Sequence, residues 1–156
     1  MPQNPKVFFL YNESMEFIKS SHSVYYTEYH IVWVTKYRKN TLNPGFAAYI
    51  KKVISDVASR IEAVEIKEIN HRENHLHLMM IIPPKYQVCK IVEIIKSRSA
   101  KIIRKKFQWL DKPYYGTTSF WSPGYCVSTV GLNEEMIRKY IQHQQKQDFG
   151  QLKIEL

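Results

Sequence analysis

His75 and His77 stand one residue apart in the run His75-Leu76-His77-Leu78. In an extended strand alternate side chains share a face, so both imidazoles should point to one side and both leucines to the other. Two imidazoles can supply two ligands of a divalent metal site. The same pair can also be structural, with each ring hydrogen-bonded and no metal bound.

Tyr140 and Gln144 are four residues apart and would share one face of a helix. A carboxamide can be a third point of a metal site, and a phenol beside it is a nucleophile suited to a phosphodiester. With the histidines, this combination favours an enzyme that cuts a nucleic acid and stays attached to it. Taken alone, a tyrosine on an apolar helix stripe usually serves packing, and Gln144 indicates nothing.

The composition favours a polyanionic partner. The chain has 156 residues, enough for one domain, and its 23 Lys and Arg against 14 acidic residues give a net charge of +9. Such a balance favours nucleic acid or an acidic membrane, although a basic surface without such a partner has the same charge. No secretory signal and no apolar run of about 18 residues is present, so no membrane partner is expected.

Cys89 and Cys126 have neither a metal-ligand spacing nor a disulfide framework. We interpret them as reduced, half-buried residues of a cytoplasmic protein.

The order of the predicted elements indicates the fold. Residues 1–23 are weakly patterned and are interpreted as an extension, and residues 24–156 as a single domain. Alternating or apolar runs predict strands, and apolar residues at helical spacing predict two amphipathic helices. The strands are expected at 24–36, 63–70, 75–82 and 125–130, the two helices at 46–61 and 87–107, and a last helix with Tyr140 at about 133–147.

This β-α-β-β-α-β order is that of the split βαβ, ferredoxin-like α+β fold, a four-stranded antiparallel sheet with helices on one face. The strand with the histidines is apolar on both sides apart from them, so it should be central in the sheet. The imidazoles should then face the side that the two helices do not cover, where the last helix can reach them.

The second helix is strongly basic. Its expected buried stripe is Val88, Ile91, Val92, Ile95, Ile102 and Ile103. Cations cover much of the remaining surface and are either a solvated face or contacts to DNA phosphates. The candidate DNA-binding residues are Lys90, Lys96, Arg98, Lys101, Arg104 and Lys105.

At these positions the chain resembles a known family. His75-Leu76-His77 is similar to the His-hydrophobic-His motif of HUH endonucleases. Tyr140 and Gln144 resemble the Tyr-x-x-x-Gln signature of single-tyrosine HUH transposases, which small bacterial and archaeal insertion sequences encode. The resemblance covers about residues 24–147. It extends to Tyr29–Trp33, Lys36–Arg38, Lys96–Ser99, Phe120-Trp121 and Ser128–Gly131.

The resemblance implies a bacterial or archaeal transposase that cuts and rejoins single-stranded DNA near subterminal hairpins. Tyr140 would form a 5′-phosphotyrosine link. His75, His77 and Gln144 would hold a divalent metal, Mg²⁺ or Mn²⁺. Family members are homodimers in which the tyrosine helix of one subunit often completes the site of the other.

Three alternatives stay open. Other HUH enzymes, namely replication initiators, relaxases and repeat-associated transposase-like proteins, use similar chemistry, although the Tyr-x-x-x-Gln spacing argues against them. A non-enzymatic nucleic-acid-binding ferredoxin-like module would expose stacking aromatics and bind no metal. A zinc hydrolase would need a further His or carboxylate ligand and would not need Tyr140.

Overall fold

A computed structural model describes residues 8–9 and 16–131. The chain divides into two compact units, and residues 27–130 form one of them. Two short 3₁₀ helices, Lys36–Arg38 and Gln108–Asp111, accompany its main elements. In chain order these are β4 (Glu28–Val34), α1 (Pro44–Ser59), β5 (Glu65–His71), β6 (His75–Ile81), α2 (Val88–Lys106) and β7 (Cys126–Thr129).

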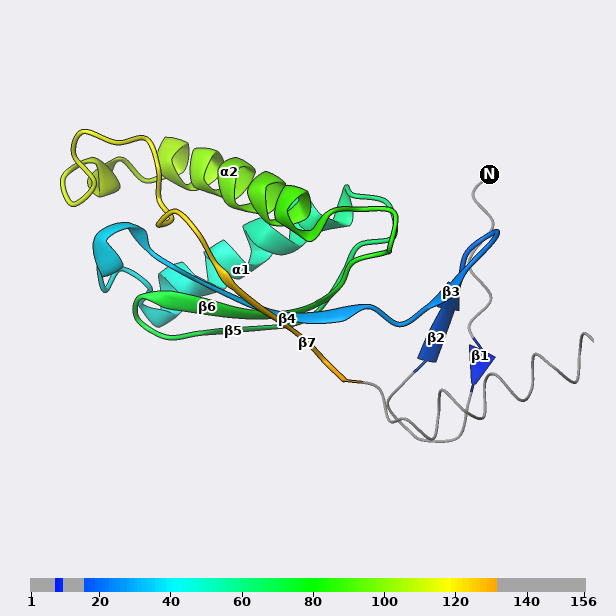
Figure 1. Ribbon diagram of the computed structural model, residues 1–156. Coiled ribbons are helices and arrows are strands. Elements are labelled where there is room, and N and C mark those ends of the chain that lie inside the picture. Colours follow the sequence, from blue (N-terminus) through cyan, green and yellow to red (C-terminus); the bar gives the residue numbers. More distant parts are fainter. Residues whose placement is uncertain (1–7, 10–15, 132–156) are drawn as a thin grey trace, which may run out of the picture. The chain divides into compact units, whose positions relative to one another are not determined.

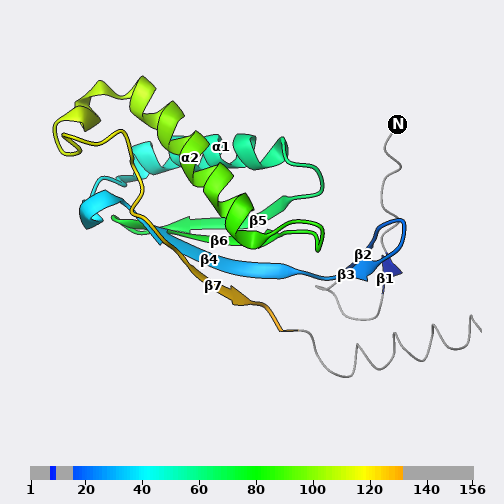
Figure 2. The same cartoon turned by 45° about the horizontal axis from the view of Figure 1, so that its top comes forward.

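The four strands of this unit form one antiparallel sheet in the order β5-β6-β4-β7. Both α1 and α2 lie on the same face of the sheet, and the opposite face carries no helix of this unit (Figure 1 and Figure 2). The predicted ferredoxin-like architecture is therefore confirmed. β6 is central, as its two-sided apolar sequence predicts.

Strand alternation decides which side chains enter the core. On β6, Leu76, Leu78 and Met80 are fully buried with residues of both helices, whereas His75 and His77 are only half-buried. On β4, Ile31 and Trp33 alternate with less buried neighbours in the same way. The core therefore lies between the sheet and the helices, and the histidine side of β6 belongs to the open face.

Helix α1 begins with a capped turn. The Asn43 side chain accepts a hydrogen bond of 3.0 Å from the backbone N–H of Phe46, and Pro44 occupies the first helical position, where no N–H partner is needed. The expected apolar stripe is buried: Phe46, Ile50, Val53, Ile54 and Val57.

Helix α2 buries a slightly different stripe from the expected one. Ile91, Val92, Ile95 and Ile103 are buried as predicted, but Ile102 is 42% exposed. Ser99 and Ala100 are buried in that turn instead, and the indole N–H of the buried Trp121 donates a hydrogen bond to the Ser99 hydroxyl. Ser99 can therefore be buried although it is polar, because its hydroxyl is hydrogen-bonded to Trp121.

The described part of the other unit is a small antiparallel sheet of β1 (Phe8–Phe9), β2 (Glu16–Lys19) and β3 (Val24–Tyr25). The single strand predicted at 24–36 is therefore wrong. Its first residues pair with β2, whereas β4 pairs with β6 and β7, and the chain changes partners between Tyr25 and Glu28.

Two further expectations concern the surface. Cys89 and Cys126 are both exposed, so their interpretation as half-buried is wrong; Cys126 lies on the edge strand β7, whose residues are all exposed. Among the residues that the structure describes, no helix has the length and apolar character needed to cross a membrane. The helix predicted at about 133–147 lies outside the described residues.

Candidate active site

His75 and His77 lie side by side on the open face of β6. Their ring centroids are 5.0 Å apart. The side chains of Leu76 and Leu78, which alternate with the histidines along the strand, are completely buried on the other face. The prediction that both imidazoles face away from the two helices is therefore confirmed. Two neutral imidazoles at this spacing are suitable metal ligands, and one face of one strand presents both.

Asn74, in the turn that leads into β6, contacts the first of these rings. Its side-chain Oδ1 lies 2.7 Å from Nδ1 of His75. Its backbone carbonyl accepts hydrogen bonds from the N–H of Thr35, at 2.8 Å, and from the Thr35 hydroxyl, at 3.2 Å. Because Thr35 is fully buried, the turn residue beside His75 is held firmly against the core.

His30 on β4 is one of four histidines to which the sequence assigned no role. Its Nε2 lies 3.2 Å from Nδ1 of His77, and the two ring centroids are 5.4 Å apart. The register pairs His77 with Val32, so His30 is the diagonal neighbour of His77 on the same face. The sequence shows only that His30 is two residues from Val32 and four from Val34, so that the three side chains share one face of a strand. The register of β4 and β6 is needed to show that this face also carries His77.

The surroundings of His77 favour its uncharged form. Partial burial lowers the pKa of His77 below its usual value, and the neighbouring His75, His30 and Arg72 lower it further. A neutral imidazole is the form that binds a metal ion, because protonation occupies the ligating lone pair. The site therefore favours the ligating form of His77 at neutral pH.

A pocket of about 420 Å³ opens beside His30 and His77 on the β5 side. Asn70 lies opposite His77 in the strand register, and its amide nitrogen donates to the Glu68 carboxylate. Arg72 adds a positive charge at the end of β5. The pocket therefore offers both hydrogen-bonding groups and a cation next to the two imidazoles; its lining is His30, Glu68, Asn70, His71, Arg72, His77 and Met79.

In the described part of the chain, no group of three or more His, Cys, Asp or Glu residues is arranged to hold a metal. A metal ion bound by the histidine pair would therefore need a further donor. Tyr140 and Gln144, the predicted nucleophile and third ligand, lie outside the described residues.

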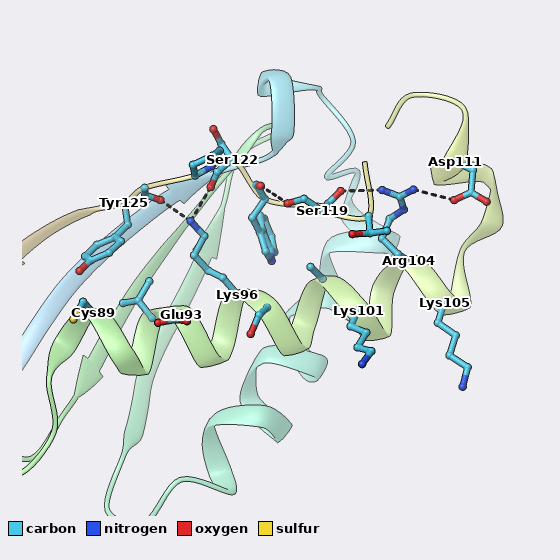
Figure 3. Close-up of a pocket in the computed structure, with 17 residues that line it drawn as sticks. Cys89, Glu93, Lys96, Lys101, Arg104, Lys105, Asp111, Ser119, Ser122 and Tyr125 are labelled. Atoms are coloured by element: carbon cyan, nitrogen blue, oxygen red, sulfur yellow. Dashed lines mark hydrogen bonds and ion pairs between the residues drawn. The ribbon is translucent and has the colours of Figure 1, made fainter. Parts of the chain in front are cut away.

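The predicted DNA-binding cations belong to a different surface, on the helix side of the sheet. A pocket of about 900 Å³ lies between α2 and the segment 118–125 (Figure 3). Four of the six candidates line it, namely Lys96, Lys101, Arg104 and Lys105. Trp121, Ala100 and Val92 contribute an apolar floor.

Two of these four cations hold the wall of the pocket in place. The Lys96 ammonium donates to the carbonyls of Ser122, at 2.7 Å, and Gly124, at 2.6 Å, and burial lowers its pKa. The Arg104 guanidinium donates to the Ser119 carbonyl at 2.9 Å and to the Asp111 carboxylate at 3.0 Å. Both residues therefore have a structural role.

The remaining candidates are exposed. Lys101 and Lys105 point from α2 to the surface near the pocket (Figure 3), and Arg98 is exposed on the same helix. Lys90 forms an exposed ion pair with Glu93 at 3.1 Å, which contributes little to stability. Lys101 and Lys105 are therefore the better probes of phosphate binding.

Comparison with known proteins establishes the family. Residues 23–144 match the protein family described as "Transposase IS200 like". The chain belongs to the IS200-like transposase family. It is 30% identical over 131 residues to the ISDra2 transposase TnpA of Deinococcus radiodurans, which covers 83% of this chain and 92% of that protein.

Two further relatives agree. The transposase for insertion sequence element IS200 of Salmonella typhimurium is 30% identical over 131 residues, covering 82% of this chain and 83% of that protein. A crystal structure of a candidate transposase from Deinococcus radiodurans matches with a TM-score of 0.63 and 28% identity, covering 81% of this chain and 97% of that one. The function is thus that of an IS200-like transposase, acting in transposition of an insertion sequence.

Proposed function

We propose that this IS200-like transposase cleaves and rejoins single-stranded DNA at the ends of its insertion sequence through a 5′-phosphotyrosine intermediate. The observation that carries the proposal is the placement of His75 and His77, side by side and half-exposed on the face of the sheet that the helices leave open. A strand substrate can reach that face. The single-stranded substrate is what the likeness of the histidine and tyrosine motifs to HUH endonucleases implies.

Tyr140 is the proposed nucleophile. Its phenolic oxygen attacks the scissile phosphorus, so that a tyrosine Oη–P bond forms while the P–O3′ bond breaks. The phenolic proton is lost and the departing 3′ oxygen gains one, which leaves a free 3′-hydroxyl. Because one phosphate ester replaces another, a 3′-hydroxyl can reverse the step and rejoin the strands without ATP.

His75, His77 and Gln144 are the proposed ligands of a divalent metal, Mg²⁺ or Mn²⁺. The two imidazoles fit such an ion, because they are half-buried and share one face of β6, and because burial lowers the pKa of His77, which favours its ligating form. When bound, a divalent cation supplies polarisation of the phosphate and fixes its orientation. The contribution of the chain is to hold the two rings at the open face, next to the pocket that contains Arg72.

The DNA partner is proposed to carry subterminal hairpins, whose phosphates contact the cations of α2.

A homodimer is proposed as well. Strand β7 is the edge strand of the described four-stranded sheet and its four residues are exposed, so we propose that its outer edge pairs with a partner subunit. The tyrosine helix of one subunit would then complete the site of the other.

One experiment tests the proposal directly. The protein is incubated with Mn²⁺ and labelled single-stranded oligonucleotides that contain the ends of its element, and the products are separated on a denaturing gel. A labelled band at the mass of the protein plus the downstream fragment is expected. Double-stranded oligonucleotides of the same sequence should give no such band, and an equal yield from both would contradict the single-stranded substrate.

A further inference from the structure

We infer that Asn74 and His30 are positioning residues that hold His75 and His77 in the tautomer with the proton on Nδ1, so that both Nε2 lone pairs stay available at the open face. The inference rests on the proposed metal site of the two histidines. It assigns a role to two side chains for which the sequence predicted none.

The contact of His75 fixes its tautomer directly. A carbonyl oxygen can only accept a hydrogen bond, so the 2.7 Å contact with Oδ1 of Asn74 requires a proton on Nδ1 of His75. A neutral imidazole carries a single N–H, which leaves Nε2 with a lone pair. Asn74 can enforce this because its own backbone carbonyl is anchored by the buried Thr35.

The contact of His77 allows two assignments. Between Nδ1 of His77 and Nε2 of His30, 3.2 Å apart, one nitrogen donates and the other accepts. If His77 binds a metal through Nε2, as proposed for His75, then Nδ1 of His77 carries the proton. This N–H donates the hydrogen bond, and Nε2 of His30 accepts the hydrogen bond. His30 then carries its own proton on Nδ1.

His30 acts through His77 and is not itself a third ligand in this arrangement. Its Nε2 is already engaged by the His77 ring, and the described residues contain no cluster of three ligating His, Cys, Asp or Glu side chains. Residues that accept the outer N–H of a ligating histidine fix both its tautomer and its ring orientation. Their loss typically lowers metal affinity about 10- to 100-fold.

The first test reads the tautomers in the metal-free, full-length protein. Long-range ¹H–¹⁵N NMR of the imidazoles at about pH 8.5, above the ordinary histidine pKa, distinguishes a proton on Nδ1 from one on Nε2. We expect Nδ1–H for His75 and His77. Asn74→Leu should release the first ring and His30→Leu the second. Asn74→Asp keeps an oxygen acceptor and His30→Gln replaces the accepting ring nitrogen by a carbonyl oxygen, so both should keep the tautomer.

The second test is titration of the same variants with Mn²⁺ by calorimetry. Each Leu variant should bind about 10- to 100-fold more weakly than the parent, and His30→Gln should recover most of the loss. Nε2–H on His77 in the parent, or an unchanged Mn²⁺ affinity in His30→Leu, would overturn the inference. Equal losses in His30→Gln and His30→Leu would also overturn it, because a hydrogen-bond acceptor at this position would then make no difference.

The two tests separate this inference from the proposed function. A parent protein with both Nδ1–H tautomers but without Mn²⁺ binding would support the tautomer assignment and contradict the proposed metal site. Circular dichroism of each variant confirms that the fold is retained, and the Asp and Gln variants serve as matched controls for each Leu variant.

Discussion

The indole N–H of Trp121 donates a hydrogen bond of 2.9 Å to the hydroxyl of Ser99 in the middle of α2. Trp121 also packs edge-on against Trp33 of β4, with ring centroids 5.8 Å apart. One side chain thus connects the sheet, the second helix and the segment that forms the wall of the basic pocket. The position of that wall relative to α2 depends on this contact.

Ser99→Ala is expected to destabilise the protein by about 1–3 kcal/mol, because it leaves the buried indole N–H without an acceptor. Urea denaturation measures the loss as a lower midpoint with an unchanged slope. Ser97→Ala, an exposed position two residues away on α2, is the control and should change stability by no more than about 0.5 kcal/mol. Equal effects of the two changes would show that the indole bond contributes nothing specific.

Tyr140→Phe should abolish the covalent DNA adduct while leaving folding and DNA binding nearly unchanged. The change removes only the phenolic oxygen, and the ring can still pack. The denaturing gel described above measures the adduct, and a filter-binding assay on the same oligonucleotide is the control. An adduct that forms at the normal rate would assign the nucleophile to another residue.

His75→Ala and His77→Ala should each remove cleavage and weaken divalent-ion binding, with little loss of DNA affinity. Gln144→Ala should have a milder effect, because a neutral carboxamide is a weaker ligand than an imidazole. Calorimetric titration with Mn²⁺ measures the binding. Unchanged affinity in both histidine variants would make these imidazoles structural.

The DNA affinity of the protein should fall with salt. If about four to six phosphates are neutralised, the logarithm of the binding constant should decrease with the logarithm of salt concentration by roughly 0.7 to 0.9 per contact. The double change Lys101→Glu with Lys105→Glu should lower affinity and flatten this slope by about 1.4 to 1.8.

The control for this change is Lys51→Glu with Lys52→Glu on α1, which alters the net charge by the same amount away from the basic pocket. It should have the smaller effect. If the DNA affinity of the parent protein hardly changed with salt concentration, the cations of α2 would be solvent-exposed side chains that do not contact phosphates.

Mixing an inactive His75→Ala chain with an inactive Tyr140→Phe chain tests the proposed dimer. If each site takes its histidines from one subunit and its tyrosine from the other, a mixed dimer regains one intact site and adduct formation returns. If each site is built within one chain, both sites of the mixed dimer are broken. No recovery, with mixed dimers demonstrated by differential tagging, would exclude the shared arrangement and leave the chemistry untouched.

The sequence by itself determined the order of the main elements within residues 27–130 and, for most of them, which side chains point to the core. Apolar residues recur every two residues in a strand and about every 3.6 residues in a helix, and this spacing indicates which side of the element meets the core. Leu76 and Leu78 could therefore be assigned to the buried side of β6 and both histidines to the open side. The order of the elements then indicated the ferredoxin-like sheet. The motifs around His75 and Tyr140 indicated the family that the comparison established.

The tertiary structure alone decided where partners change and which distant groups meet. A run of β-branched and aromatic residues does not mark the point at which β3 ends and β4 begins, because β3 pairs with the preceding strand β2 whereas β4 pairs with β6 and β7, which are far away in the chain. For the same reason the sequence could not place His30 against His77, 47 residues away, or the Lys96 ammonium on the carbonyls of Ser122 and Gly124. Local periodicity encodes the face of an element, whereas contacts between elements depend on register and packing, which exist only in the folded chain.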